Sequence, residues 1–106
     1  MDLTVKNIFA DRPRAIDGEN FSTLFESSSV KIEKIVSHSH SSPPGFWYDQ
    51  NEDEWVIVLR GTAALEFAAG EIVEMKEGDY LLVPRHTRHR VARTSENTVW
   101  LAVHLK

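Results

Sequence analysis

The chain has 106 residues, 42% of them hydrophobic and 26% charged, which fits one globular domain and excludes the disordered and fibrous classes. It has no cysteine, so disulfides and thiolate metal sites are excluded, any metal must be bound by nitrogen and oxygen ligands, and a reducing cytoplasmic location is expected. A net charge of -4 argues against a nucleic-acid partner, and the absence of long apolar runs and of a basic apolar leader argues against a membrane span or an export signal.

The first part of the chain, residues 1–29, is expected to form an arm and an edge strand. Pro13 and Gly18 interrupt its beginning, where no apolar period is sustained. Two β-prone segments follow at 21–26 and 30–37, and the serines between them predict a hairpin. The sequence SSPPG that comes next predicts a loop, because its two prolines lack backbone donors and its glycine is free to turn.

The rest of the chain predicts a series of short strands. β-Prone residues gather in segments that are separated by glycine, proline or polar turns: 54–60, 62–68, 71–76, 80–83, 88–93 and 98–105. No helical period of apolar residues is found after Gly45. The fold class is therefore an antiparallel all-β domain, with its barrel over 30–106. Segments 55–59 and 99–105 are apolar on both faces, as expected where one face fills a barrel and the other meets a second sheet or a second subunit, and of these we expect a homodimer.

Two segments of this β-rich region carry a matched pair of motifs. In the first, Glu54 opens the run EWVIVLRG and precedes Gly61 by six intervening residues. The second, GDYLLVPRHTRH, runs from Gly78 through Pro84 to His89. This pair of spacings resembles the two motifs of the cupin superfamily, and in particular its small single-domain members of the cupin 2 type. The resemblance implies a jelly-roll β-barrel in which the glutamate and the histidine meet on a metal.

The resemblance also implies a set of metal ligands. Its first motif has two histidines before the glutamate, and Tyr48 and Gln50 occupy those positions here. On an extended segment both side chains share a face with Glu54. Since phosphomannose isomerases of this superfamily use a glutamine ligand, the implied set is Gln50, Glu54 and His89, with donors that suit Zn, Fe(II), Mn or Ni. The alternative is that Glu54 is a solvated strand end and His89 a hydrogen-bonded barrel residue.

The remaining candidate histidines each have two interpretations. His38 and His40 would share a face of an extended segment and could replace the two missing imidazoles, or they could be a polar strand end that faces solvent. His86 stands where the second motif usually has glycine. It could carry protons in catalysis, because imidazole titrates near neutral pH, or it could be an exposed turn residue.

Tyr48, Trp47 and Arg93 are candidates for contact with a substrate. Tyr48 could donate a proton or a hydrogen bond during catalysis, and Trp47 beside it could form a wall of the site. Arg93 shares strand parity with His89, so it could point inward and pair with an anionic substrate or with an acid of the barrel.

Two functions are consistent with these residues. The first is a metal-dependent enzyme of the isomerase, dioxygenase or lyase type that acts on a small polar substrate, such as a carbohydrate or a carboxylate. The second is a non-catalytic cupin that binds a small ligand as a sensor, because other residues occupy both histidine positions of the first motif. The fold alone does not select between them.

Overall fold

The computed structural model describes residues 1, 3–10 and 18–106, and the described residues form eight β-strands and no helix. The strands are β1 (Gly18–Glu26), β2 (Val30–His38), β3 (Asp53–Arg60), β4 (Ala63–Phe67), β5 (Ile72–Met75), β6 (Tyr80–Val83), β7 (His89–Thr94) and β8 (Thr98–Leu105). Within these described ranges, therefore, no helix exists that could cross a membrane.

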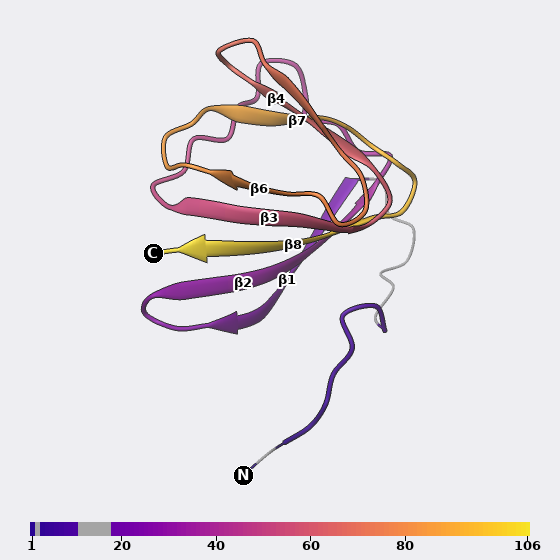
Figure 1. Cartoon of the computed structure of the whole chain (residues 1–106), viewed down its shortest axis with the longest axis vertical. Helices are drawn as coiled ribbons and strands as arrows, with labels where there is room; N and C mark the ends of the chain where they lie inside the picture. The colour runs from indigo at the N-terminus through magenta and orange to yellow at the C-terminus, as the bar shows by residue number, and fades with distance from the viewer. Residues whose placement is uncertain (2, 11–17) are drawn as a thin grey trace.

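The strands form two antiparallel sheets that make up the walls of a jelly roll (Figure 1). The larger sheet has the strand order β1-β2-β8-β3-β6, and the smaller has the order β5-β4-β7. Most connections after β3 pass from one sheet to the other, which closes the barrel around an interior. The predicted all-β jelly roll is confirmed.

The predicted strands are confirmed with small shifts at their ends. The hairpin expected from segments 21–26 and 30–37 is β1–β2, and in its turn the hydroxyl of Ser27 accepts a hydrogen bond from the backbone N–H of Ser29 at 3.2 Å. β1 begins at Gly18, earlier than expected, and forms one edge of the larger sheet. Residues 11–17 of the predicted arm lie outside the described residues.

Strand β3 shows how the sequence supplies both faces of the barrel wall. Glu54, Val56 and Val58 are buried and face the interior, whereas Trp55 and Ile57 between them are half-buried and face outward. The interior positions join an apolar core drawn from both sheets: Ile35, Val56, Val58, Ala63, Leu65, Met75, Val91, Trp100 and Ala102. At the end of this core, Glu54 takes the inward position of β3 next to Val56. The packed interior opens there into a polar cavity.

Candidate functional site

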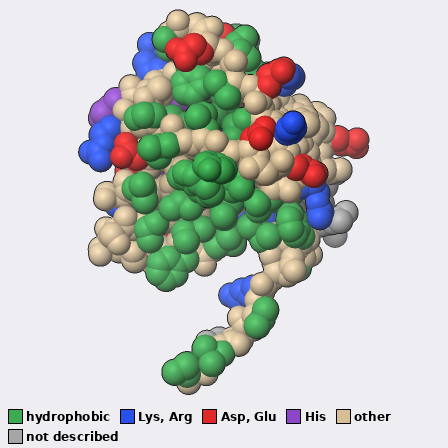
Figure 2. Space-filling view, viewed as in Figure 1, with side chains coloured by type: hydrophobic (Ala, Val, Ile, Leu, Met, Phe, Trp, Pro, Cys, Tyr) green, Lys and Arg blue, Asp and Glu red, His purple; other side chains and the backbone are tan. Residues whose placement is uncertain are grey.

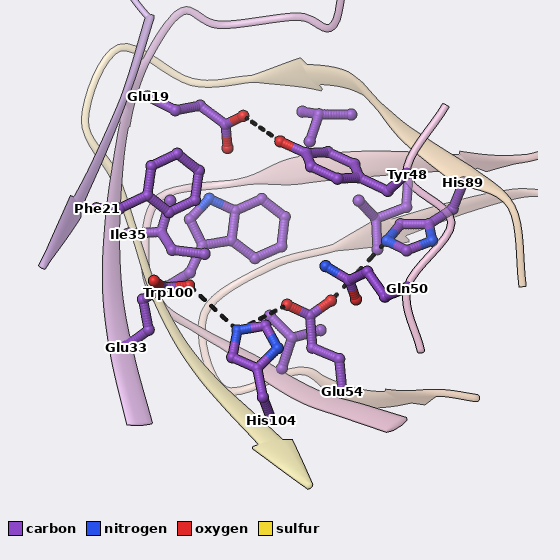
Figure 3. A pocket seen from close by; sticks show the side chains of 13 residues that line it. Glu19, Phe21, Glu33, Ile35, Tyr48, Gln50, Glu54, His89, Trp100 and His104 are labelled. Carbon is purple, nitrogen blue, oxygen red and sulfur yellow. Dashed lines mark hydrogen bonds and ion pairs between the residues drawn. The ribbon is translucent and has the colours of Figure 1, made fainter. Parts of the chain in front are cut away.

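A cavity of about 70 Å³ lies inside the barrel, which is space for roughly five water molecules. Its lining comes from both sheets and from the segment before β3: Glu19, Phe21, Glu33, Ile35, Tyr48, Gln50, Glu54, Val56, Leu65, His89, Val91, Trp100 and His104. Figure 3 shows the polar side chains in two groups, one around Tyr48 and one around Glu54. The four motif positions from which the sequence predicted a site therefore share one cavity.

Glu54 lies at the centre of the second group. It is 8% exposed, with Oε1 3.9 Å from Nε2 of His89 and Oε2 3.7 Å from Nε2 of His104. Both distances are longer than a hydrogen bond, and no described residue donates a hydrogen bond to this carboxylate. Burial raises the pKa of Glu54, although the two imidazoles oppose the rise. Glu54 is thus a buried acceptor with unused capacity and not a solvated strand end.

His89 begins β7 and is held in one tautomer. Its Nδ1 lies 2.7 Å from the carbonyl oxygen of Thr87, which can only accept, so Nδ1 carries the proton and Nε2 keeps its lone pair. Nε2 is the atom that faces Glu54. The ring of Tyr48 stacks on the imidazole with ring centroids 5.5 Å apart. His89 therefore offers the cavity a fixed nitrogen that can accept a proton or bind a metal.

The segment that carries Tyr48 and Gln50 is fastened to β7. Tyr48 exchanges two backbone hydrogen bonds with His89, of 2.7 and 3.1 Å, and its hydroxyl donates to Oε1 of Glu19 at 3.0 Å. Burial, and then the charge of Glu19, raise the pKa of Tyr48, so the phenol stays protonated at neutral pH. The side-chain amide of Gln50 lines the cavity and has no hydrogen-bond partner among the described residues. Its oxygen is available to a cation or a hydroxyl group.

The three carboxylates of the cavity differ in their partners. Glu19 has the tyrosine hydroxyl described above and, at 3.0 Å, Nε2 of His40. Glu33 has Nε2 of His104 at 3.1 Å. Glu54 has no partner at hydrogen-bonding distance in the described part of the chain, and no lysine or arginine is among the lining residues. The cavity is therefore acidic. Its carboxylate without a hydrogen-bond donor is Glu54, the glutamate of the first motif.

Sequence reasoning missed three polar residues of this cavity: Glu19, Glu33 and His104. His104 lies directly opposite Glu54 in the pairing of β8 with β3. A signal was present, since His104 has the same strand parity as Trp100, which is in the core. The pairing itself could not be predicted, because β8 lies between β2 and β3 in the sheet but is distant from both in sequence.

His38 and His40 do not line the cavity. His38 ends β2, and its Nδ1 lies 3.1 Å from the carbonyl oxygen of Glu96, in the turn between β7 and β8. His40 stands behind Glu19 and meets the cavity only through that carboxylate. The second imidazole near Glu54 comes instead from His104.

His86 and Trp47 also lie outside the cavity lining. His86 has a φ of 59°, its backbone N–H donates to the carbonyl oxygen of Gln50 at 2.7 Å, and its Nδ1 lies 3.0 Å from Oδ1 of Asp49. These contacts hold the segment that carries Gln50 against the turn before β7. Trp47 lies under the guanidinium of Arg88, at 5.7 Å from the ring centroid.

Arg93 points away from the cavity, and a bulge explains why the expected parity fails. The pairing of β7 with β4 shifts between Val91 and Arg93, so Ala92 is an extra residue in β7. The strand changes face at that point. The side chain of Arg93 is 55% exposed and forms an ion pair with Glu74, whereas His89 before the bulge faces inward.

The donors in the cavity suit a divalent cation that is held by few protein ligands. Glu54, His89 and Gln50 offer the oxygen and nitrogen donors that Zn, Mn, Fe and Ni accept, and acidic surroundings favour a cation. Among the residues that the structure describes, however, no three or more His, Cys, Asp or Glu are placed to hold a metal. A third ligand would have to come from the amide of Gln50 or from water, and the expected set stays a prediction.

Comparison with known proteins identifies the family. The model of the Cupin_2 family, described as a cupin domain, matches residues 32–104. The chain is a cupin. The family expected from the two motifs is therefore confirmed, and the match includes both of them.

Solved structures extend this relationship. This cupin is 48% identical to a candidate mannose-6-phosphate isomerase from Ralstonia eutropha JMP134, with 97% of this chain and 98% of that chain covered and a TM-score of 0.91. An RmlC-like cupin from Desulfovibrio desulfuricans is 17% identical, with 95% and 96% covered and a TM-score of 0.74. Another from Methanocaldococcus jannaschii is 18% identical, with 90% and 86% covered and a TM-score of 0.70. The last two share the fold alone. No curated protein matches the chain.

Proposed function

We propose that this cupin binds a divalent metal in its barrel and acts there on a small, polar, carbohydrate-like substrate. The observation that carries the proposal is Glu54, a buried carboxylate without a hydrogen-bond partner among the described residues. Leaving such a group without a partner is costly, so a cation or a ligand hydroxyl at this position would stabilise it. His89 and Gln50 stand beside it with donor atoms that no described residue uses.

The lining of the cavity favours hydroxyl groups over anions as the part of the substrate that enters. Carboxylates accept hydrogen bonds from hydroxyls, whereas a substrate carboxylate or phosphate would meet three glutamates and no lysine or arginine. Phe21 and Trp100 add apolar surface to the wall. Of the two substrate classes expected from the sequence, the carbohydrate-like class therefore fits the lining better. A phosphate or carboxylate group of such a substrate would stay outside, at the mouth of the cavity.

The residues of the site support an isomerase type of reaction, in which a proton moves between neighbouring carbons. The name of the relative from Ralstonia eutropha supports the same type. Nε2 of His89 would be used by the metal, so another group of the lining would accept the proton. His104, which pairs with Glu33 at 3.1 Å and lies 3.7 Å from Glu54, is the candidate. The hydroxyl of Tyr48 already donates to Glu19 and holds that carboxylate in place. A metal bound beside Glu54 would polarise a carbonyl or hydroxyl oxygen of the substrate. We place this activity in the cytoplasm.

Turnover of mannose and of mannose 6-phosphate to the corresponding ketoses, followed by NMR, tests the proposal. We expect the protein loaded with Zn, Mn, Fe(II) or Ni to convert at least one of these sugars. Glu54→Gln and His89→Gln should each lower kcat/KM by about 100-fold or more, because each removes a group that would hold the metal. His38→Gln is the control, because His38 lies outside the cavity. Unchanged turnover in both cavity variants, or none in the metal-loaded wild type, would contradict the enzyme.

A non-catalytic ligand-binding cupin is the second candidate. It is favoured by one observation: the described residues contain no group of three or more His, Cys, Asp or Glu that could hold a metal. This candidate requires that a neutral sugar raise the Tm of metal-free protein without being converted. Conversion of the sugar, or a shift in Tm that depends on added metal, would count against it.

A further inference from the structure

The turn between β6 and β7 holds a histidine in an uncommon backbone conformation. The turn is closed by a hydrogen bond from the backbone N–H of Thr87 to the carbonyl oxygen of Pro84, at 3.2 Å. His86 occupies its third position with φ 59°, where a positive φ usually selects glycine. Non-glycine residues in the left-handed region are uncommon, and they gather at functional sites. The side chain of His86 is therefore expected to make a contact that glycine could not make.

That contact is with the segment that precedes β3. Nδ1 of His86 lies 3.0 Å from Oδ1 of Asp49, and a carboxylate oxygen can only accept, so Nδ1 carries the proton and donates it. The backbone N–H of His86 donates to the carbonyl oxygen of Gln50 at 2.7 Å. The two side chains are 61% and 50% exposed, and Figure 2 shows histidine and basic side chains at the left margin, on the side where Figure 1 draws this turn. One residue thus holds two successive positions of the segment.

The neighbours of this histidine hold the other two segments that carry the expected metal ligands. The backbone N–H of Arg85 donates to Oδ1 of Asp53 at 2.8 Å, directly before Glu54. The carbonyl oxygen of Thr87 accepts the Nδ1 proton of His89 at 2.7 Å. Three consecutive residues of the turn therefore contact the three segments of the site. Outer contacts of this kind orient metal ligands before the metal binds.

Gln50 is the expected ligand that depends most on being held. Its amide oxygen is neutral, so it attracts a cation less strongly than the carboxylate of Glu54 does. Glu54 and His89 lie in strands, whereas Gln50 lies in the connection between β2 and β3, which spans residues 39–52. A ligand in such a connection loses conformational freedom when it binds, and prior fixation reduces that cost. Among the described residues, the hydrogen bonds to positions 49 and 50 of this connection come from His86.

We propose that His86 is a positioning residue for the metal site. Its hydrogen bond to Asp49, called the tether below, keeps the segment of Gln50 against the turn, so that the amide oxygen is already in the cavity when a metal arrives. Glycine would adopt the backbone conformation more readily, but it has no side chain that could bond to Asp49. The inference rests on the metal site of the proposed function and adds to it a residue outside the cavity that sets the affinity for the metal.

Co²⁺ titrated into metal-free protein, followed by visible absorption, tests the tether, because both the affinity and the spectrum depend on the ligand set. His86→Gly keeps the positive φ and removes the tether, so the Kd for Co²⁺ should rise by about 10-fold or more. Asp49→Ala should have the same effect, and the double variant should lose no more than either single variant, since both remove one interaction. His86→Asn should restore the wild-type Kd and spectrum, because asparagine tolerates a positive φ and has a side-chain N–H donor.

Ser39→Gly is the matched control. Ser39 is the other described non-glycine residue with a positive φ, of 48°, and it lies outside the cavity lining. Its replacement by glycine should leave the Kd for Co²⁺ unchanged. Far-UV circular dichroism of each variant verifies that it is folded. An unchanged Kd in both His86→Gly and Asp49→Ala, or an equal rise in Ser39→Gly, would overturn the proposed role of His86.

Hydrogen exchange of metal-free protein separates this inference from the proposed function. In Asp49→Ala the backbone amide of His86 should exchange about 10-fold faster than in the wild type, because its hydrogen bond to Gln50 opens more often without the tether. A wild type that binds no Co²⁺ would contradict the proposed metal site. An unchanged exchange rate would overturn the tether itself, whatever the result with the metal.

Discussion

At the scale of residues, Glu54 determines what the cavity can bind. Its two neighbouring carboxylates already have hydrogen-bonded partners, whereas its own oxygens face two imidazole nitrogens at 3.7 and 3.9 Å. Burial disfavours the charged form, which is why its pKa is raised. The ionised carboxylate of Glu54 is therefore poorly solvated. A proton would neutralise its charge, and a cation or a substrate hydroxyl would stabilise the charge.

The raised pKa of Glu54 predicts how the stability of metal-free protein depends on pH. A group whose pKa is higher in the folded state stabilises the protein below its unfolded pKa, about 4.5 here, and this contribution is lost as pH rises through the folded pKa. Relative to Glu54→Gln, the wild type should therefore lose Tm between pH 4 and pH 8. A change of about 1 kcal/mol would shift Tm by roughly 4–8 °C.

Thermal unfolding in the presence of a chelator measures this difference. Glu71→Gln is the control, because Glu71 is exposed in the turn before β5. Its Tm should stay parallel to that of the wild type at every pH. Parallel profiles for Glu54→Gln as well would mean that burial does not destabilise the charged form of Glu54.

At the scale of elements, the two motif glycines have the same backbone conformation for different reasons. Gly61 follows β3 with φ +86°, and Gly78 precedes β6 with φ +88°. A Cβ at Gly61 would lie 2.6 Å from Oγ of Ser95 and 2.9 Å from both the carbonyl oxygen of Asn97 and Oγ1 of Thr98, whereas a Cβ at Gly78 would meet nothing within 4 Å. Gly61 thus permits a close approach of the turn before β8, and Gly78 only permits a turn.

Alanine at these two positions separates the two reasons. Both substitutions place a side chain in a left-handed conformation, which costs about 1–2 kcal/mol. Gly61→Ala must in addition displace its neighbours, at a further cost of about 1–3 kcal/mol. Urea denaturation should therefore find Gly61→Ala the less stable variant. Equal free energies of unfolding for the two variants would show that the turn before β8 can move to accommodate the added Cβ at no cost in stability.

The elements themselves were largely predictable from local sequence. β-Prone runs between glycine, proline and serine turns give the strands closely, because turn residues limit where a strand can continue. The direction of Arg93 was not predictable, since the bulge at Ala92 arises from how β7 pairs with β4 and leaves no mark in the alternation of residues.

At the scale of the whole molecule, the cavity is assembled from strands that are distant in the chain. Tyr48, Gln50, Glu54 and His89 could be brought together before the structure was known because the two motifs resemble those of cupins, whereas strand parity alone relates only residues of one segment. His104 could not, since its position beside Glu54 depends on β8 pairing with β3. Local alternation therefore predicts which residues face inward where a strand has no bulge, and only the order of strands in the sheet shows which of them meet.

The metal content of protein purified without chelator tests the central claim most directly. Elemental analysis should find about one divalent transition metal per chain in the wild type, and much less than that in Glu54→Ala and His89→Ala, since few other ligands hold it. His38→Ala, altered outside the cavity, should keep the metal. A wild type without stoichiometric metal, or metal retained in both cavity variants, would contradict the account.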